Sequence, residues 1–258
     1  GMTTSEISFA PQPGAVTKSR QVRSQAAFEF KLLMRNGEQL LLTVIIPIFL
    51  LVGLTYMPFI KSGDQPRVTL VVPGVIALAI MSTAFTAQAI SVGFDRRYGV
   101  LKLLGVTPLS RIRLLLAKTV AVLAIEAIQI VLILTVASLL GWRPVGNPFG
   151  ALLLVILGTA AFSSLSFALA GVLRAEATLA AANAIYLLLL LAGGTVIPRD
   201  QMPGWLGTAG QALPSGALGN GLREVMAAGG GIPTSSALIL LVWFAIGTLI
   251  AARTFRWE

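Results

Sequence analysis

The chain has 258 residues, of which 56% are hydrophobic and only 11% charged, and its mean hydropathy is +0.87. Soluble domains carry about 25% charged residues, so the composition excludes an ordinary soluble domain and indicates an all-α integral membrane protein. The absence of histidine and cysteine excludes Cys-His zinc sites, His- or Cys-bound haem, disulfides, catalytic cysteines and Ser-His-Asp triads. No Gly-Lys pair occurs, so a Walker A loop is excluded and ATP-driven work needs another chain.

The net charge of +9 would suggest a nucleic-acid partner for a soluble protein. In a membrane protein it more often reflects basic loops that face anionic lipid on the cytoplasmic side. We therefore expect membrane lipid, and no nucleic acid, as a partner.

Six apolar stretches are long enough, or nearly so, to cross a bilayer, which takes about 20 helical residues. They cover residues 40–57, 68–93, 114–140, 151–173, 177–197 and 232–252. Residues 1–18 are predicted to form a disordered cytoplasmic tail, and residues 19–258 a single six-span membrane domain.

The distribution of Lys and Arg predicts that both termini are cytoplasmic. Six spans place the two termini on one side, and the segments on that side hold 14 of the 19 basic residues. These are Lys18, Arg20, Arg23, Lys31, Arg35, Arg96, Arg97, Lys102, Arg111, Arg113, Lys118, Arg174, Arg253 and Arg256. The other side holds Lys61, Arg67, Arg143, Arg199 and Arg223.

Residues 19–35 are predicted to form a basic amphipathic helix that lies in the inner headgroup layer. At 100° per residue, apolar Val22, Ala26 and Phe30 share one face, while Arg23 and Lys31 lie on another. The alternative is an ordinary cytosolic helix or a frayed tail.

Residues 94–113, between the second and third spans, contain a short apolar ridge in an otherwise cytosolic loop. Its apolar residues are Val100, Leu101, Leu103 and Leu104. Thr107 is placed to cap the next helix and Pro108 to begin it. The ridge suggests a docking element for a partner protein, although basic loop helices also occur simply because of the charge bias.

The outer stretch 198–231 is too apolar for a plain loop and is interrupted by prolines and glycines. Two short helices are predicted at 205–213 and 217–226, forming a re-entrant hairpin in the outer leaflet, with Trp205 at the interface. The alternative is a solvent-exposed loop.

Four residues with carboxyl or amide side chains lie within predicted spans: Gln88, Glu126, Gln129 and Asn183. A polar group at such depth must face the bundle, a cavity or water, because burial of an unpaired group is costly. They are candidate residues of a translocation path. For Glu126, whose i,i+3 neighbour is Gln129, an interhelical hydrogen bond is the favoured alternative.

Three features together resemble the permease subunits of type-2 ABC exporters, over residues 20–256. The first is the amphipathic helix, and the second is the loop DRRYGVLKLLGVTPLSR at 95–111. The third is the run Gly193-Gly194-Thr195-Val196-Ile197-Pro198, followed by Met202-Pro203-Gly204-Trp205-Leu206, Leu213-Pro214 and Leu222-Arg223. Family members often carry Glu two residues before the loop glycine, where this chain has Arg97.

The resemblance implies a coupling helix over residues 95–105 that docks on a separate nucleotide-binding subunit. The residues that it assigns to coupling are Asp95, Arg96, Arg97, Gly99, Val100, Leu101, Leu103, Leu104, Thr107 and Pro108. It also implies an extracellular gate at Pro198, Pro203, Trp205 and Pro214.

The assembly implied by the resemblance has two permease copies, or this chain and a paralogue, with two cytosolic ATPase subunits in a bacterial plasma membrane. ATP and Mg²⁺ would bind the ATPase subunits. This chain would hold no cofactor, metal or catalytic residue, and would not itself be an enzyme. The long apolar spans favour a hydrophobic or amphipathic cargo such as a drug, lipid or glycolipid.

Two other function classes fit the residues less well. A secondary transporter would need ion sites within the membrane, and Glu126 is the only acidic residue well inside a span. A membrane enzyme lacks the groups for catalysis, because there is no His, no Cys and no pair of intramembrane carboxylates.

Overall fold

The computed structural model describes residues 17–35, 37–58, 63–97, 111–192 and 203–254. Within these ranges the regular structure is helical, with no strand. The helices are α1 (Lys18–Arg35), α2 (Gly37–Thr55), α3 (Arg67–Ile80), the π-helix η1 (Met81–Ala87), α4 (Gln88–Arg97), α6 (Arg111–Leu139), α7 (Pro148–Val172), α8 (Ala175–Ala192), α9 (Gly204–Ala212), α10 (Pro214–Met226) and α11 (Thr234–Thr254).

Four helical segments in the described residues are long and apolar enough to span a membrane: 67–97, 113–139, 148–172 and 234–254. Two shorter apolar helical segments lie at 43–55 and 175–191. Such lengths match the roughly 30 Å hydrocarbon core of a bilayer, because an α-helix rises about 1.5 Å per residue. The chain is therefore an all-α, multi-pass membrane protein, as its composition predicts.

The central element is the rod formed by α3, η1 and α4, which packs against α2, α6, α7, α8 and α10. Every residue from Val71 to Ile80 is buried, which explains why this stretch is apolar on all sides rather than along one stripe. The rod carries a π-helical segment at its middle, a feature that often marks a functional region of a helix. Residue Gln88, the first of α4, directly follows that segment.

Helices α7 and α11 form the most extensive helix–helix contact. Gly247 of α11 permits it, because a Cβ atom there would lie only 2.3 Å from the Ser164 Oγ atom of α7. The α6–α7 connection is tied to α10 by a hydrogen bond in which the Asn147 backbone N–H donates to the Val225 carbonyl over 2.7 Å. Asn147 also caps α7 by accepting from the N–H groups of Phe149 and Gly150, and Pro148 follows at the first helical position.

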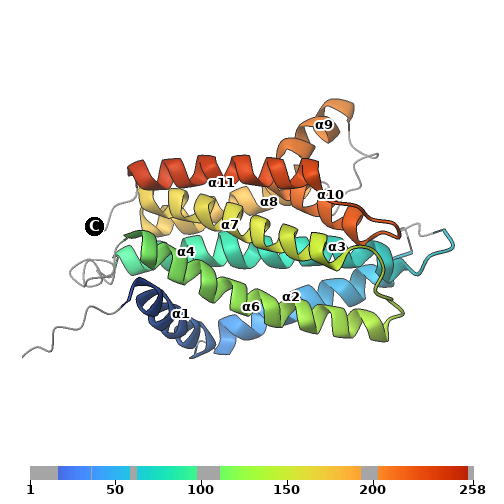
Figure 1. Ribbon diagram of the computed structural model, residues 1–258, viewed down its shortest axis with the longest axis horizontal. Helices are drawn as coiled ribbons and strands as arrows, with labels where there is room; N and C mark the ends of the chain where they lie inside the picture. Colours follow the sequence, from blue (N-terminus) through green and yellow to red (C-terminus); the bar gives the residue numbers. More distant parts are fainter. Residues whose placement is uncertain (1–16, 36, 59–62, 98–110, 193–202, 255–258) are drawn as a thin grey trace, which may run out of the picture.

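The chain passes back and forth between the two ends of the bundle (Figure 1). One end, at the left of the figure, gathers the end of α4, the beginning of α6, the α7–α8 connection and the end of α11, with α1 beside them. The opposite end gathers the α2–α3 and α6–α7 connections, and α9 projects from the side of the bundle near the beginning of α11 (Figure 1). Helices α9 and α10 fall in the stretch where the sequence predicts two short helices, and α10 buries most of its length against α7, α11 and α3.

Several sequence predictions lie outside the described residues. These are the tail over residues 1–16 and, of the predicted coupling and gate residues, Gly99, Val100, Leu101, Leu103, Leu104, Thr107, Pro108 and Pro198.

Candidate functional site

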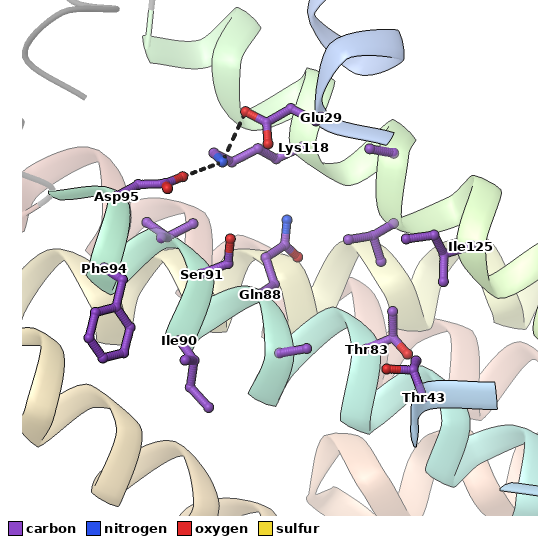
Figure 2. A pocket seen from close by; sticks show the side chains of 14 residues that line it. Glu29, Thr43, Thr83, Gln88, Ile90, Ser91, Phe94, Asp95, Lys118 and Ile125 are labelled. Carbon is purple, nitrogen blue, oxygen red and sulfur yellow. Dashed lines mark hydrogen bonds and ion pairs between the residues drawn. The ribbon is translucent and has the colours of Figure 1, made fainter. Parts of the chain in front are cut away.

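A buried ion triad joins three helices near the end of the bundle where α4 finishes (Figure 2). The Lys118 ammonium of α6 lies 2.9 Å from Asp95 Oδ2 of α4 and 3.1 Å from Glu29 Oε1 of α1. Lys118 is 4% exposed and Glu29 8% exposed. Charges with so little access to water are retained only when they are paired, so the triad fixes the positions of α1, α4 and α6 relative to one another.

Arg96 and Arg97, which follow Asp95, contact α7, the residue after it and α8 at the same end of the bundle. The Arg96 guanidinium donates to the carbonyls of Ala170, over 2.8 Å, and Leu173, over 2.7 Å, where α7 ends. Arg97 forms an ion pair with Glu176 at the beginning of α8. Three consecutive residues predicted to act in coupling thus contact α6, α7 and α8 in turn, immediately before segment 98–110.

The beginning of α6, on the other side of that segment, is tied to α1. Arg113 donates a hydrogen bond to Gln21 Oε1, and α1 packs along α6 more extensively than along any other described helix. Ala26 and Glu29 face inward on α1, whereas Phe28 and Leu32 remain exposed. The helix therefore presents an apolar stripe to its surroundings in addition to the face that packs on α6.

A cavity of about 340 Å³ extends from the triad into the bundle. Its wall is formed by residues from α1, α2, η1, α4 and α6, and Figure 2 shows polar side chains directed into it. The lining residues are Glu29, Thr43, Thr83, Ala87, Gln88, Ile90, Ser91, Val92, Phe94, Asp95, Lys118, Ala121, Val122 and Ile125.

Gln88 is the predicted path residue that lines this cavity. Its side chain is 5% exposed, and neither the amide oxygen nor the amide nitrogen has a hydrogen-bond partner among the described residues. Buried amides nearly always have partners, because desolvation without a hydrogen bond is costly. An unpartnered buried amide at a cavity wall is therefore a candidate contact for a bound molecule.

Glu126 and Gln129 instead bridge helices. Thr159 of α7 donates a hydrogen bond of 2.5 Å to Glu126 Oε2. Gln129 accepts from the Thr83 hydroxyl of η1, over 3.1 Å, and donates to the Thr43 carbonyl of α2, over 2.8 Å. Both side chains are 1% exposed, and neither lines the cavity.

The remaining predicted site residues lie apart from the cavity. Asn183 is on an exposed face of α8, where its amide donates to the Leu179 carbonyl one turn earlier. Pro203 and Trp205 are exposed at the beginning of α9, with Trp205 74% exposed, whereas Pro214 is buried where α10 begins. The structure thus separates the four path candidates into one cavity residue, two bridging residues and one surface residue.

Sequence reasoning missed the roles of Glu29, Lys118, Thr83 and Thr159. Lys118 carried a usable signal, because it lies several residues inside the third apolar stretch and an unpaired ammonium there would be costly. The cytoplasmic bias of basic residues is sufficient by itself to account for a lysine near the beginning of this stretch. Thr83 and Thr159 carried little signal, since threonine hydroxyls inside helices commonly bond to the carbonyl one turn earlier.

Within the described ranges, no group of three or more His, Cys, Asp or Glu residues is placed to hold a metal ion. The ion triad contains only two carboxylates, and both contact the Lys118 ammonium.

Comparison with known proteins gives two matches. The family model described as "ABC-2 type transporter" matches residues 20–227. The "Putative transport permease YvfS" of Bacillus subtilis (strain 168) is 25% identical over 247 residues, covering 91% of this chain and 96% of the relative.

Proposed function

The chain belongs to the ABC-2 type transporter family, and from that premise we propose that it is the permease subunit of an ATP-driven exporter. It carries a hydrophobic or amphipathic substrate out of the cytoplasm or the inner leaflet. Two copies, or one copy and a paralogue, assemble with two cytosolic ATPase subunits, which bind the ATP and Mg²⁺. The absence of a Gly-Lys pair in the sequence accords with this division of labour.

The observation that carries the coupling role is the set of polar ties around segment 98–110. Before the segment, Asp95 pairs with Lys118, and Arg97 with Glu176. After it, Arg113 contacts Gln21. A displacement of this segment by a docked ATPase would therefore be passed to α1, α4, α6 and α8 together, through charge-assisted contacts at that end of the bundle.

The membrane arrangement that we propose has six spans. The two shorter apolar helices, α2 and α8, add to the four long ones, and the N- and C-termini lie in the cytoplasm of a bacterial plasma membrane. Helix α1 lies in the inner headgroup layer with Phe28 and Leu32 toward lipid. Helices α9 and α10 form the outer hairpin, and Pro198, Pro203, Trp205 and Pro214 contribute to an extracellular gate.

The test of this function is a double substitution in the predicted coupling helix, Leu103→Asp with Leu104→Asp. Burying these charges in the contact with the ATPase costs several kcal/mol unless they are paired. We expect the variant to insert and fold but to lose co-purification with the ATPase, or to hydrolyse ATP without transport. Normal coupling in this variant would contradict the docking role. A charge at Leu116 would be an unsuitable control, because Leu116 lies within a span.

A better control is the pair of substitutions Thr208→Asp and Ala209→Asp. These exposed residues lie on α9, at the opposite end of the bundle (Figure 1). They add the same charge as the double leucine substitution, so retained ATPase binding there separates a specific contact from a general effect of charge.

A further inference from the structure

We propose that the cavity between α1, α2, η1, α4 and α6 binds an amphipathic organic cation, with its positively charged group toward Glu29 and Asp95 and its hydrogen-bonding groups against Gln88. The inference rests on the proposed function in one respect, because it takes the cavity to be a ligand site of a permease. It adds the chemical class of the ligand and the residues that select it.

The charges of the wall favour a cation. Among the residues that line the cavity, the charged ones are Glu29, Asp95 and Lys118. Two carboxylates share a single ammonium, so the described lining carries one excess negative charge. The excess lies in a largely buried setting, where a counter-charge is attracted more strongly than it would be in water.

Asp95 is the carboxylate through which a ligand could add to the triad without dismantling it. Its side chain is 30% exposed, against 10% for Glu29 and 5% for Lys118. The Lys118 contact uses Asp95 Oδ2. A carboxylate accepts several hydrogen bonds, so an ammonium group can pair with it while the contact with Lys118 persists.

Gln88 supplies the second and independent observation. Its amide is buried, is directed into the cavity, and has no hydrogen-bond partner for either its oxygen or its nitrogen among the described residues (Figure 2). Such a group can both donate and accept. A ligand with an N–H donor or a carbonyl acceptor would supply the hydrogen bond that the Gln88 amide lacks and offset the free-energy cost of burying it.

The rest of the wall suits an apolar body. Ala87, Ala121, Val122 and Ile125 line the cavity beside Gln88 and toward the middle of the bundle. A volume of about 340 Å³ is at the small end of the range for ligand sites. Figure 2 shows the charged triad at one end of the cavity and Ile125 with Thr43 and Thr83 at the other, so the far end is uncharged and suits the less polar part of an amphiphile.

The experiment measures binding of rhodamine 6G, a fluorescent amphipathic cation with N–H donors, to the purified full-length permease in phosphatidylglycerol nanodiscs. Fluorescence anisotropy is recorded without any ATPase, and the signal of protein-free discs is subtracted. Fluorescein ethyl ester, which has a similar ring system but is anionic at pH 8, is titrated in parallel. We expect saturable binding of the cation and at least tenfold weaker binding of the anion.

Two variants test the residues. Gln88→Leu should weaken rhodamine 6G binding about five- to tenfold, the loss expected for an amide hydrogen bond to a ligand. It should leave the melting temperature of the ligand-free protein unchanged or raise it, because the substitution removes an unpartnered buried amide. Glu29→Gln should weaken binding of the cation by a similar factor. Gln211→Leu, a matched control in α9 outside the cavity, should bind rhodamine 6G as the unmodified chain does.

The cation could be a solute or the headgroup of an aminolipid, and a second arm separates them. Addition of phosphatidylethanolamine to the discs should lower the apparent affinity for rhodamine 6G if an aminolipid occupies the site, and should leave it unchanged if the ligand is a solute. Both results support a cation site. Unaltered binding in Gln88→Leu, equal binding of the two dyes, or no saturable binding would overturn it. Co-purification of the ATPase with the unmodified chain, measured in a separate preparation, shows that such a failure concerns the cavity and not the permease function.

Discussion

Lys118 of α6 and Asp95 of α4 are 23 residues apart in the sequence and form an ion pair with a nitrogen–oxygen distance of 2.9 Å. The pair connects the beginning of a long apolar helix to the last turns of the rod formed by α3, η1 and α4. Because Glu29 of α1 joins it, one ammonium holds three helices together at the end of the bundle where α4 finishes and α6 begins.

Replacement of this ammonium should be severely destabilising. Lys118→Met leaves two buried or partly buried carboxylates without their cation, and removal of one partner from a buried ion pair costs roughly 3–5 kcal/mol. Thermal unfolding of the detergent-solubilised protein measures the loss. The matched control is Arg97→Gln, which breaks an ion pair whose side chains are about half exposed and should cost less than about 1 kcal/mol. Equal stability of Lys118→Met and the unmodified chain would contradict a structural role for the triad.

Glu126→Gln should preserve both stability and transport. The Gln oxygen can accept the hydrogen bond that Thr159 donates to Glu126, and the bridge between α6 and α7 persists. Glu126→Leu removes the acceptor, while the Thr159 hydroxyl can still donate to the Val155 carbonyl over 2.7 Å, so loss of the bridge should cost about 0.5–1.5 kcal/mol. Loss of transport in the Gln variant at unchanged melting temperature would place Glu126 on the translocation path and contradict the bridging role.

Gly247→Ala should destabilise the bundle by forcing α11 away from α7. The added Cβ would lie 2.3 Å from Ser164 Oγ and 2.9 Å from the Leu165 nitrogen. Ser164 already donates to the Ala161 carbonyl, so a rotation away from the new methyl group would sacrifice a hydrogen bond. Overpacking of this kind costs about 1–3 kcal/mol.

Gly53→Ala is the control for that substitution, because a Cβ there meets nothing within 4 Å. It should be neutral or stabilising by up to about 1 kcal/mol, as expected for Gly→Ala inside a helix. Melting temperatures of the two variants in the same detergent decide the matter, and indistinguishable values would show that the α7–α11 approach is not tight.

The proposed orientation predicts which introduced cysteines are reachable from outside the cell. Ser19 near the beginning of α1 and Arg253 near the end of α11 are both exposed, and these helix termini lie at the end of the bundle where α4 finishes. Cysteines at these two positions should react with an impermeant thiol reagent only after the cells are opened. Cysteines at Asp64 and Val145, exposed at the opposite end, should react in intact cells. The chain has no native cysteine, so each signal comes from one position. Labelling of position 19 or 253 in intact cells would contradict the proposed orientation and indicate the opposite one.

Hydropathy alone was sufficient to predict an all-α membrane protein, because a helix in lipid must satisfy its own backbone and expose apolar side chains. It could not reveal the π-helix at Met81–Ala87, since a change of helical pitch within an apolar run leaves composition unchanged. It also could not pair the polar groups. Thr159 contacts Glu126, a residue 33 positions earlier in the chain, only because α7 packs on α6.

The candidate site, like the fold, could be predicted from the sequence only in part. Four residues with carboxyl or amide side chains stand out in apolar stretches, and the cost of burying them predicts that they face the bundle, a cavity or water. In the structure, Gln88, Glu126 and Gln129 are buried. Which of them lines a cavity depends on the packing of five helical elements. The fourth candidate, Asn183, lies at similar depth in its own stretch but is exposed on α8, so depth along a helix predicts neither burial nor a partner without the packing.

The most direct test of the account is purification of the full-length chain from the membranes of its native cells, where the ATPase subunit of the proposed assembly is also present. We predict that the two proteins co-purify and that the complex, reconstituted in liposomes, transports solute only when ATP is supplied on the ATPase side. A folded chain that carries no ATPase and moves solute in response to a proton gradient alone would contradict the account and favour a secondary transporter.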